Sequence, residues 1–132
     1  AVRVLNRAGF LIVIVTNQAG IARGIVKESF VAEAHRHIAD RLEAGGAKID
    51  GFYYCPHYPT GTVEKYRTVC DCRKPQPGLL RRAAADLDID LARSFVVVRG
   101  IVTRHPSSSR RRREPCAGGS RLDRTRASSA RR

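Results

Sequence analysis

Three cysteines and one histidine form two closely spaced pairs, Cys55-Pro-His57 and Cys70-Asp-Cys72. Residues two positions apart in an extended segment point to the same side, so each pair can offer both side chains to one metal ion. Three thiolates and an imidazole are a ligand set that zinc accepts in a tetrahedral site. Because four protein ligands leave no position for water, the predicted zinc site is structural. The alternative is three unrelated thiols and a surface histidine.

A second group of polar residues is suited to phosphate binding. Thr16-Asn17-Gln18 follows an apolar run and offers a hydroxyl, two amides and backbone N–H groups. Arg73-Lys74 follows the second cysteine pair and adds two cations. Each group alone is a weak signal, because such residues often begin turns or lie on solvated surface. Their order along the chain, with the metal loop between them, favours a phosphate site.

These residues need a framework of strands and helices to bring them together. Continuous β-branched runs predict buried strands, and apolar residues at helical spacing predict helices. The strands are expected over 10–15, 49–54 and 95–98, and the helices over 1–8, 28–44 and 78–87. This alternation predicts an α/β fold with three layers and a parallel, Rossmann-like sheet. Such sheets bind ligands at the carboxyl ends of their strands, and Thr16 lies at such an end.

The predicted helix over 28–44 has one apolar face, formed by Phe30, Val31, Ala34, Ile38 and Leu42. Such a stripe predicts the side that packs on the sheet. His35 and His37 are two positions apart, so they point to different sides of the helix, and both are expected on the surface.

The positive charge of the chain is concentrated at one end. The net charge is +13, and residues 99–132 hold 11 arginines and two acidic residues. This Arg/Ser-rich segment has too few aliphatic residues to build a core, so it is predicted to be a disordered tail. Its abrupt change of composition suggests an out-of-frame segment, and Cys116 within it is considered incidental. The predicted domain is therefore 1–98, with the zinc loop at 55–77.

Composition also limits the compartment and the partners. The longest apolar run is far too short to span a membrane, and Arg3 and Arg7 interrupt any secretory signal. We expect a cytoplasmic monomer with reduced thiols. The basic tail would bind nucleic acid only non-specifically, because it has no interleaved aromatic residues for base stacking.

Three motifs in a fixed order resemble one family of phosphatases. They are Thr16-Asn-Gln-Ala-Gly-Ile-Ala-Arg-Gly24, Tyr54-Cys-Pro-His57 and Cys70-Asp-Cys-Arg-Lys-Pro-Gln-Pro-Gly78. Together they resemble the D-glycero-D-manno-heptose 1,7-bisphosphate phosphatases, a zinc-containing branch of the haloacid dehalogenase superfamily. The resemblance covers roughly residues 1–98 and implies that fold in incomplete form. The related histidinol-phosphate phosphatases share the zinc loop and are the alternative.

The resemblance implies hydrolysis of a sugar phosphomonoester through an aspartyl-phosphate, with Mg²⁺ neutralising charge. By matched position, Thr16 would hold the transferring phosphoryl group and Lys74 would stabilise its charge. The implied substrate-binding residues are Asn17, Gln18, Ala19 and Arg73, and the implied structural zinc ligands are Cys55, His57, Cys70 and Cys72.

Two parts of the family's pattern are absent from this sequence. No acidic residue precedes Thr16, so the Asp-x-Asp-Gly nucleophile motif is missing. Val98-Arg99-Gly100 stands where the family has Val-Gly-Asp, so the Mg²⁺-binding carboxylate is missing and a cation lies in its motif. We therefore expect the chain as written not to hydrolyse phosphate esters. A third interpretation is a non-enzymatic module whose basic tail binds nucleic acid.

Overall fold

The computed structural model describes residues 1–98, 101–104 and 119–120, and two parallel strands form its centre. Strand β1 (Val13–Asn17) pairs along its whole length with β2 (Gly51–Cys55), with Val13 opposite Gly51 and Asn17 opposite Cys55. The short strand β5 (Gly119–Ser120) pairs antiparallel with β2. The order β1-β2-β5 leaves β1 at the edge of this sheet within the described part of the chain.

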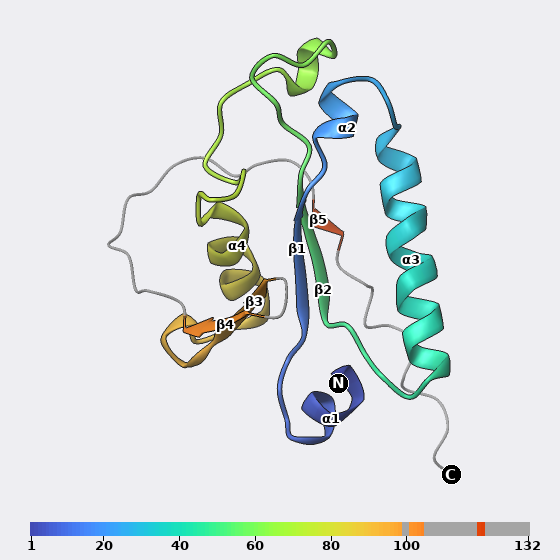
Figure 1. Ribbon diagram of the computed structural model, residues 1–132, viewed down its shortest axis with the longest axis vertical. Coiled ribbons are helices and arrows are strands. Elements are labelled where there is room, and N and C mark those ends of the chain that lie inside the picture. Colours follow the sequence, from blue (N-terminus) through green and yellow to red (C-terminus); the bar gives the residue numbers. More distant parts are fainter. Residues whose placement is uncertain (99–100, 105–118, 121–132) are drawn as a thin grey trace.

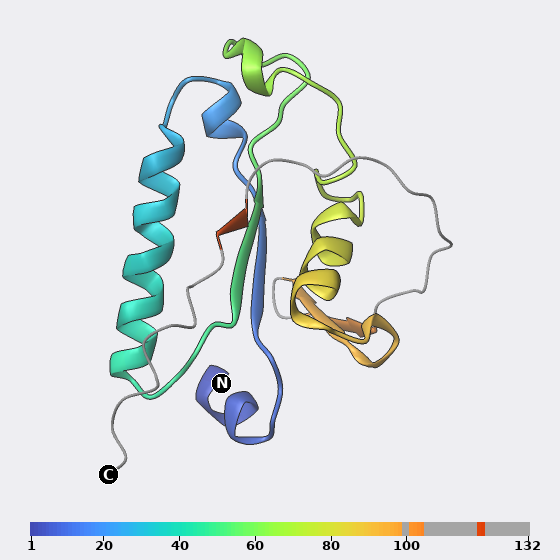
Figure 2. The ribbon, with the colours of Figure 1, turned by 180° about the vertical axis from the view of Figure 1, so that it is seen from behind.

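Two long helices cover opposite faces of the parallel strands (Figures 1 and 2). Helix α4 (Gly78–Leu87) packs Leu79 and Ala83 against Tyr53 of β2. On the other face, Val31 of α3 (Glu28–Ala44) packs in one cluster with Tyr54. The side chains of neighbouring β2 residues thus pack on opposite faces of the sheet, as strand geometry requires. The predicted three-layer α/β fold is confirmed.

The remaining helical elements are short. They are α1 (Val2–Arg7), α2 (Ala19–Ala22) and the two 3-10 turns η1 (Glu64–Tyr66) and η2 (Leu91–Arg93). Within the described residues, no helix has the length and apolar character needed to cross a bilayer.

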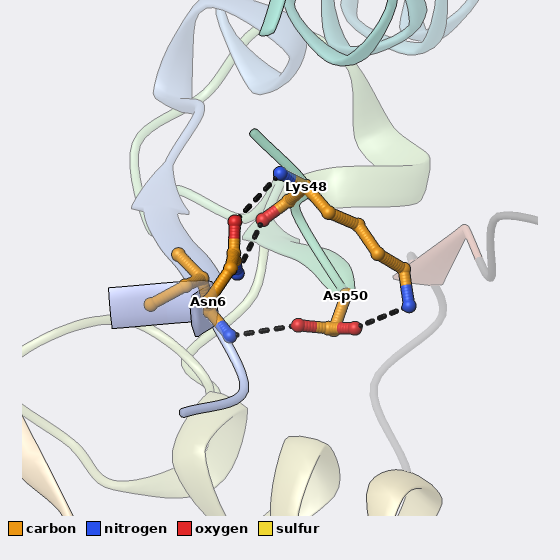
Figure 3. Close-up of polar contacts among 4 residues, drawn as sticks. Asn6, Lys48 and Asp50 are labelled. Carbon is orange, nitrogen blue, oxygen red and sulfur yellow. Dashed lines mark hydrogen bonds and ion pairs between the residues drawn. The ribbon is translucent and has the colours of Figure 1, made fainter. Parts of the chain in front are cut away.

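A polar network fixes the end of the two strands that lies far from the metal loop (Figure 3). The Asn6 side chain exchanges two hydrogen bonds, of 3.2 and 2.8 Å, with the backbone of Lys48. Asp50 pairs with the Lys48 ammonium at 2.8 Å, and its other carboxylate oxygen accepts the Ile12 N–H at 2.9 Å. Because a side chain takes the Ile12 N–H, β1 begins at Val13. The strand predicted over 10–15 therefore started too early and ended too early.

The buried side of α3 agrees with the predicted one only in part. Phe30 and Ile38 are 59% and 41% exposed, whereas Val31 and His35 are 4% and 6% exposed. The His35 ring stacks on Phe52 of β2 with a centroid separation of 4.6 Å. The prediction that His35 lies on the surface was wrong, because its ring packs against the aromatic residues Phe52 and Tyr54 of β2. His37 is exposed, as predicted.

Strand β3 (Phe95–Val98) does not join the parallel sheet. It pairs antiparallel with β4 (Ile101–Arg104) in a separate two-stranded sheet, with Val98 opposite Ile101. A hairpin closes a very short loop, so its entropic cost is small, and both segments are rich in β-branched residues. The predicted disordered tail thus contains strands at 101–104 and 119–120, and the rest of it, including Cys116, lies outside the described residues.

The burial of His35 gives a prediction about pH. Burial lowers the pKa of His35 below its ordinary value of 6.5, and no group in the described part of the chain forms a hydrogen bond with its Nδ1. The unfolded chain therefore takes up a proton first as the pH falls below this ordinary value, and the free energy of unfolding should decrease there. Denaturant unfolding between about pH 8 and 5 measures the slope of the free energy of unfolding against pH.

The His35→Phe variant should lose this part of the slope, because phenylalanine keeps the stacking and carries no titrating group. The His37→Phe variant is the matched control on the exposed side of the same helix. Equal slopes for wild type and His35→Phe would contradict the prediction.

Candidate metal centre and phosphate-binding edge

The two predicted ligand pairs meet in one buried cluster. The ligand atoms of Cys55, His57, Cys70 and Cys72 all lie within 4.8 Å of one another. The Cys70 sulfur is 3.5 Å from that of Cys55 and 3.2 Å from that of Cys72. The Nδ1 atom of His57 is 3.3 Å from the Cys72 sulfur and 3.7 Å from the Cys55 sulfur. The structure therefore brings together all four residues that the spacing predicted.

These separations suit a tetrahedral ion. With Zn–S bonds of about 2.3 Å, two sulfur ligands of a regular tetrahedron lie about 3.8 Å apart, close to the separations in this cluster. The three cysteines are free thiols, and all four ligand positions are protein groups of the kind that zinc prefers. The cluster thus fits a closed, structural zinc site held by Cys55, His57, Cys70 and Cys72.

The electrostatics of the cluster favour a thiolate. The hydrogen bond from the Cys72 side chain lowers the pKa of Cys55 to about 5, against the opposing effect of burial, and the His57 backbone and Cys70 add to the lowering. Thiolate is the form that binds metal. The Cys55 thiol is therefore prepared to bind a cation with little cost for deprotonation.

Strand β2 and helix α4 hold the two ligand pairs in place. Cys55 is the last residue of β2 and is fully buried. On the other side, the Gly78 N–H donates to the Asp71 carbonyl at 2.9 Å. A Cβ atom at Gly78 would lie 2.5 Å from that carbonyl oxygen, so the close approach of α4 to the second pair requires glycine.

Glu28 connects the metal loop to the start of α3. Its carboxylate accepts hydrogen bonds from the hydroxyls of Tyr54, at 2.8 Å, and Tyr66, at 2.5 Å. Tyr66 belongs to the loop between the ligand pairs, and its backbone carbonyl accepts the Tyr58 N–H. The Tyr66 hydrogen bond lowers the pKa of Glu28 despite partial burial. One carboxylate thereby fixes the loop to both β2 and α3.

The residues predicted to handle phosphate are only partly brought together. The Asn17 side chain exchanges two hydrogen bonds with the Lys74 backbone, of 3.0 and 3.3 Å. The Lys74 ammonium donates to the Val15 carbonyl at 3.0 Å, so it lies beside the residue that precedes Thr16. Asn17 and Lys74 therefore share the carboxyl end of β1.

Thr16, Gln18 and Ala19 have different surroundings. Thr16 and Gln18 line a cavity of about 280 Å³ between β1 and α3, together with Ile14 and His35. The Gln18 N–H donates to the Cys55 carbonyl at 2.8 Å, which connects this segment to the metal cluster. Ala19 is the first residue of α2.

Arg73 joins a group that the sequence analysis missed. Its Nη1 donates to the His57 carbonyl at 3.2 Å, and its guanidinium lies 5.0 Å from the centre of the Tyr58 ring. The guanidinium of Arg23 lies 4.4 Å from the same ring centre. The hydrogen bond from Arg23 lowers the pKa of the Tyr58 hydroxyl. Arg23 is part of the first quoted motif, but only the fold brings it to Tyr58.

Known proteins resemble this chain over most of its described part. The D-glycero-beta-D-manno-heptose-1,7-bisphosphate 7-phosphatase of Rhodopseudomonas palustris is 44% identical over 97 residues, which are 74% of this chain and 54% of that protein. The enzyme of the same name from Escherichia coli K12 is 47% identical over 97 residues, 74% of this chain and 51% of that protein. No family model matches the sequence.

A solved structure supports the same relationship. It is the D,D-heptose 1,7-bisphosphate phosphatase of B. bronchiseptica, complexed with magnesium and phosphate. It superposes with a TM-score of 0.58 and 34% identity, over 69% of this chain and 47% of that one. The comparisons confirm the resemblance that the motifs predicted. The chain spans about half the length of the curated relatives it matches.

The contact between Glu28 and the loop predicts an effect on metal affinity. In Glu28→Gln the carboxylate that accepts both tyrosine hydroxyls is lost, so the loop should be less well ordered before binding. Zinc affinity, measured by competition with a chelator, should fall about tenfold. Glu33→Gln, on the exposed side of the same helix, is the matched control. Unchanged affinity in Glu28→Gln would show that this contact does not order the loop.

Proposed function

We propose that this chain forms the phosphate-holding part of a phosphatase with the haloacid dehalogenase-like fold. It matches about half the length of the D-glycero-beta-D-manno-heptose-1,7-bisphosphate 7-phosphatases. The observation that carries the proposal is the hydrogen-bonded contact of Lys74 with Asn17 and Val15 at the carboxyl end of β1. This contact places a cation where α/β sheets bind ligands.

The roles of the individual residues follow from their chemistry. Lys74 would stabilise charge on the transferring phosphoryl group, and Thr16 would donate its hydroxyl to a phosphate oxygen. Asn17 keeps Lys74 at the strand end. Gln18 and Ala19, in the segment that connects β1 to α2, would line the substrate pocket. Arg73 would recognise the part of the substrate that does not react.

The proposed roles of the two metals differ. Zinc, held by the Cys/His cluster, would order the loop that carries Arg73 and Lys74 and would take no part in the reaction. The predicted phosphate-handling residues of this chain offer hydroxyl, amide and cationic groups. Magnesium prefers carboxylate oxygens, so this set does not fit magnesium, and a magnesium site needs carboxylates beyond these residues. The nucleophile of the implied aspartyl-phosphate is likewise a carboxylate that these residues do not supply.

The reduced thiols of the cluster support the proposal of a cytoplasmic location. Three free cysteines that converge on one site serve a metal ion only while they remain unoxidised, a state that the cytoplasm maintains. We also retain the proposals of a monomer and of a tail that binds nucleic acid only non-specifically.

A chimera tests the proposed function directly. Residues 1–97 of this chain would replace the matching segment of the Escherichia coli relative, which supplies the remaining parts. We expect the chimera to hydrolyse heptose 1,7-bisphosphate in preference to histidinol phosphate. Lys74→Ala in the chimera should lower kcat by about a hundredfold or more, because electrostatic stabilisation of the transferring group is lost.

The 132-residue chain alone, assayed under the same conditions, serves as the reference. A folded, zinc-loaded chimera without activity, or one in which Lys74→Ala has full activity, would contradict the proposal.

A further inference from the structure

The three clustered cysteines differ in their access to solvent. Cys55 and Cys72 are 0% and 2% exposed, whereas Cys70 is only half-buried. Val69, which directly precedes Cys70, is 83% exposed, so the chain reaches the surface beside this thiol. Small oxidants react first with the thiolates that they can reach. Hydrogen peroxide in solution therefore meets the sulfur of Cys70 before it meets the other two.

Cys70 also has thiol neighbours at contact distance. Its sulfur lies 3.5 Å from the sulfur of Cys55 and 3.2 Å from that of Cys72. A cysteine that has been oxidised to a sulfenic acid condenses with a nearby thiol to form a disulfide. The cluster thus places an accessible sulfur next to two buried sulfurs that can react with it.

The backbone around Asp71 favours Cys55 as the partner. A disulfide between Cys70 and Cys72 would close a small ring in which Asp71 is the one intervening residue. The Asp71 carbonyl accepts the Gly78 N–H at 2.9 Å, and a Cβ atom at Gly78 would lie 2.9 Å from the Cα atom of Cys72. Because the start of α4 holds this stretch so closely, the twist that a small ring requires is unfavourable. A bond to Cys55 of β2 closes a longer loop without that twist.

Contacts apart from the metal keep the loop close to β2. The Tyr66 hydroxyl of the loop donates to the Glu28 carboxylate at 2.5 Å, and the Tyr54 hydroxyl of β2 donates to the same carboxylate at 2.8 Å. The Tyr58 N–H donates to the Tyr66 carbonyl at 3.1 Å. These hydrogen bonds do not involve the thiols, so they persist when the thiols are oxidised, and a thiol reductant can reverse the reaction.

We propose that Cys70 is a site of reversible oxidation by peroxide and that its product is a disulfide with Cys55. Hydrogen peroxide takes two electrons from the Cys70 thiolate, its O–O bond breaks, and a sulfenic acid and one hydroxide ion form. The Cys55 thiolate then attacks the Cys70 sulfur, the S–S bond forms, and a second hydroxide ion leaves. Two thiolates and one peroxide thus give one disulfide and two hydroxide ions.

The disulfide is incompatible with the proposed metal site. Two of the four clustered residues then offer no thiolate, so the cluster releases the ion. Cys72 directly precedes Arg73-Lys74, so the loss of the ion also loosens the segment that carries Lys74. The inference rests on the proposed zinc site and goes beyond the proposed phosphatase function, on which it does not depend.

Peroxide titration of the zinc-loaded chain tests this assignment without requiring turnover. Cys116→Ser, used as the background, removes the fourth cysteine of the chain. A chromophoric chelator should detect about one zinc ion released for each disulfide formed. Peptide mapping by mass spectrometry should find Cys55 linked to Cys70. Dithiothreitol followed by zinc should restore the loaded form.

Two matched variants, each lacking one proposed ligand, identify the cysteine that is oxidised first. In Cys55→Ser the proposed partner is missing, so dimedone, which reacts with sulfenic acids, should label Cys70 about tenfold more than Cys72. In Cys72→Ser the proposed pair is intact, so the disulfide should form and little dimedone should be incorporated. The comparison separates the loss of the partner from the loss of a ligand.

The possible contradictions are distinct. A main product that links Cys70 to Cys72, or dimedone mainly on Cys72 in Cys55→Ser, would overturn the assignment of Cys70 and Cys55. Zinc that stays bound after the disulfide has formed would overturn the link between oxidation and metal release. A folded chain that never binds zinc would contradict the proposed metal site, and the link to metal release would fail with it. All of these results leave the proposed phosphatase function to its own test.

Discussion

The convergence of three thiols and an imidazole is the constraint on which the rest of the structure depends. Their ligand atoms lie within 4.8 Å of one another, yet they come from the end of β2 and from the segment that precedes α4. The polar loop between the pairs has few apolar side chains with which to form a core of its own. A shared cation would add to the contact of Tyr66 with Glu28 in holding this loop in one conformation.

Backbone hydrogen bonds and short chain segments connect the cluster to the carboxyl end of β1. The Gln18 N–H donates to the carbonyl of Cys55, and Lys74 follows Cys72 by two residues; both cysteines are proposed ligands. Asn17 then joins Lys74 to β1. A disturbance of the metal loop should therefore displace the cations at the strand end, although none of them is a metal ligand.

Local signals allowed part of this fold to be predicted from sequence, and contacts between distant segments determined the rest. Helix α3 ends at Ala44, as predicted, because the glycines that follow stop it. The convergence of the four Cys and His residues was predicted because their spacing is itself the signal. The burial of His35 was missed because it depends on Phe52 of another element. The grouping of Arg23 with Tyr58 was missed for the same reason, since it exists only after α2 contacts the loop.

A zinc titration followed by amide hydrogen exchange tests the central claim most directly. We predict that the chain binds about one zinc ion and that binding slows exchange at the Gln18 and Lys74 amides, whose acceptors are Cys55 O and Asn17 Oδ1. Protection of both amides would show that the metal orders the phosphate-binding edge. A folded chain that binds no zinc, or one whose two amides exchange equally fast with and without zinc, would contradict the account.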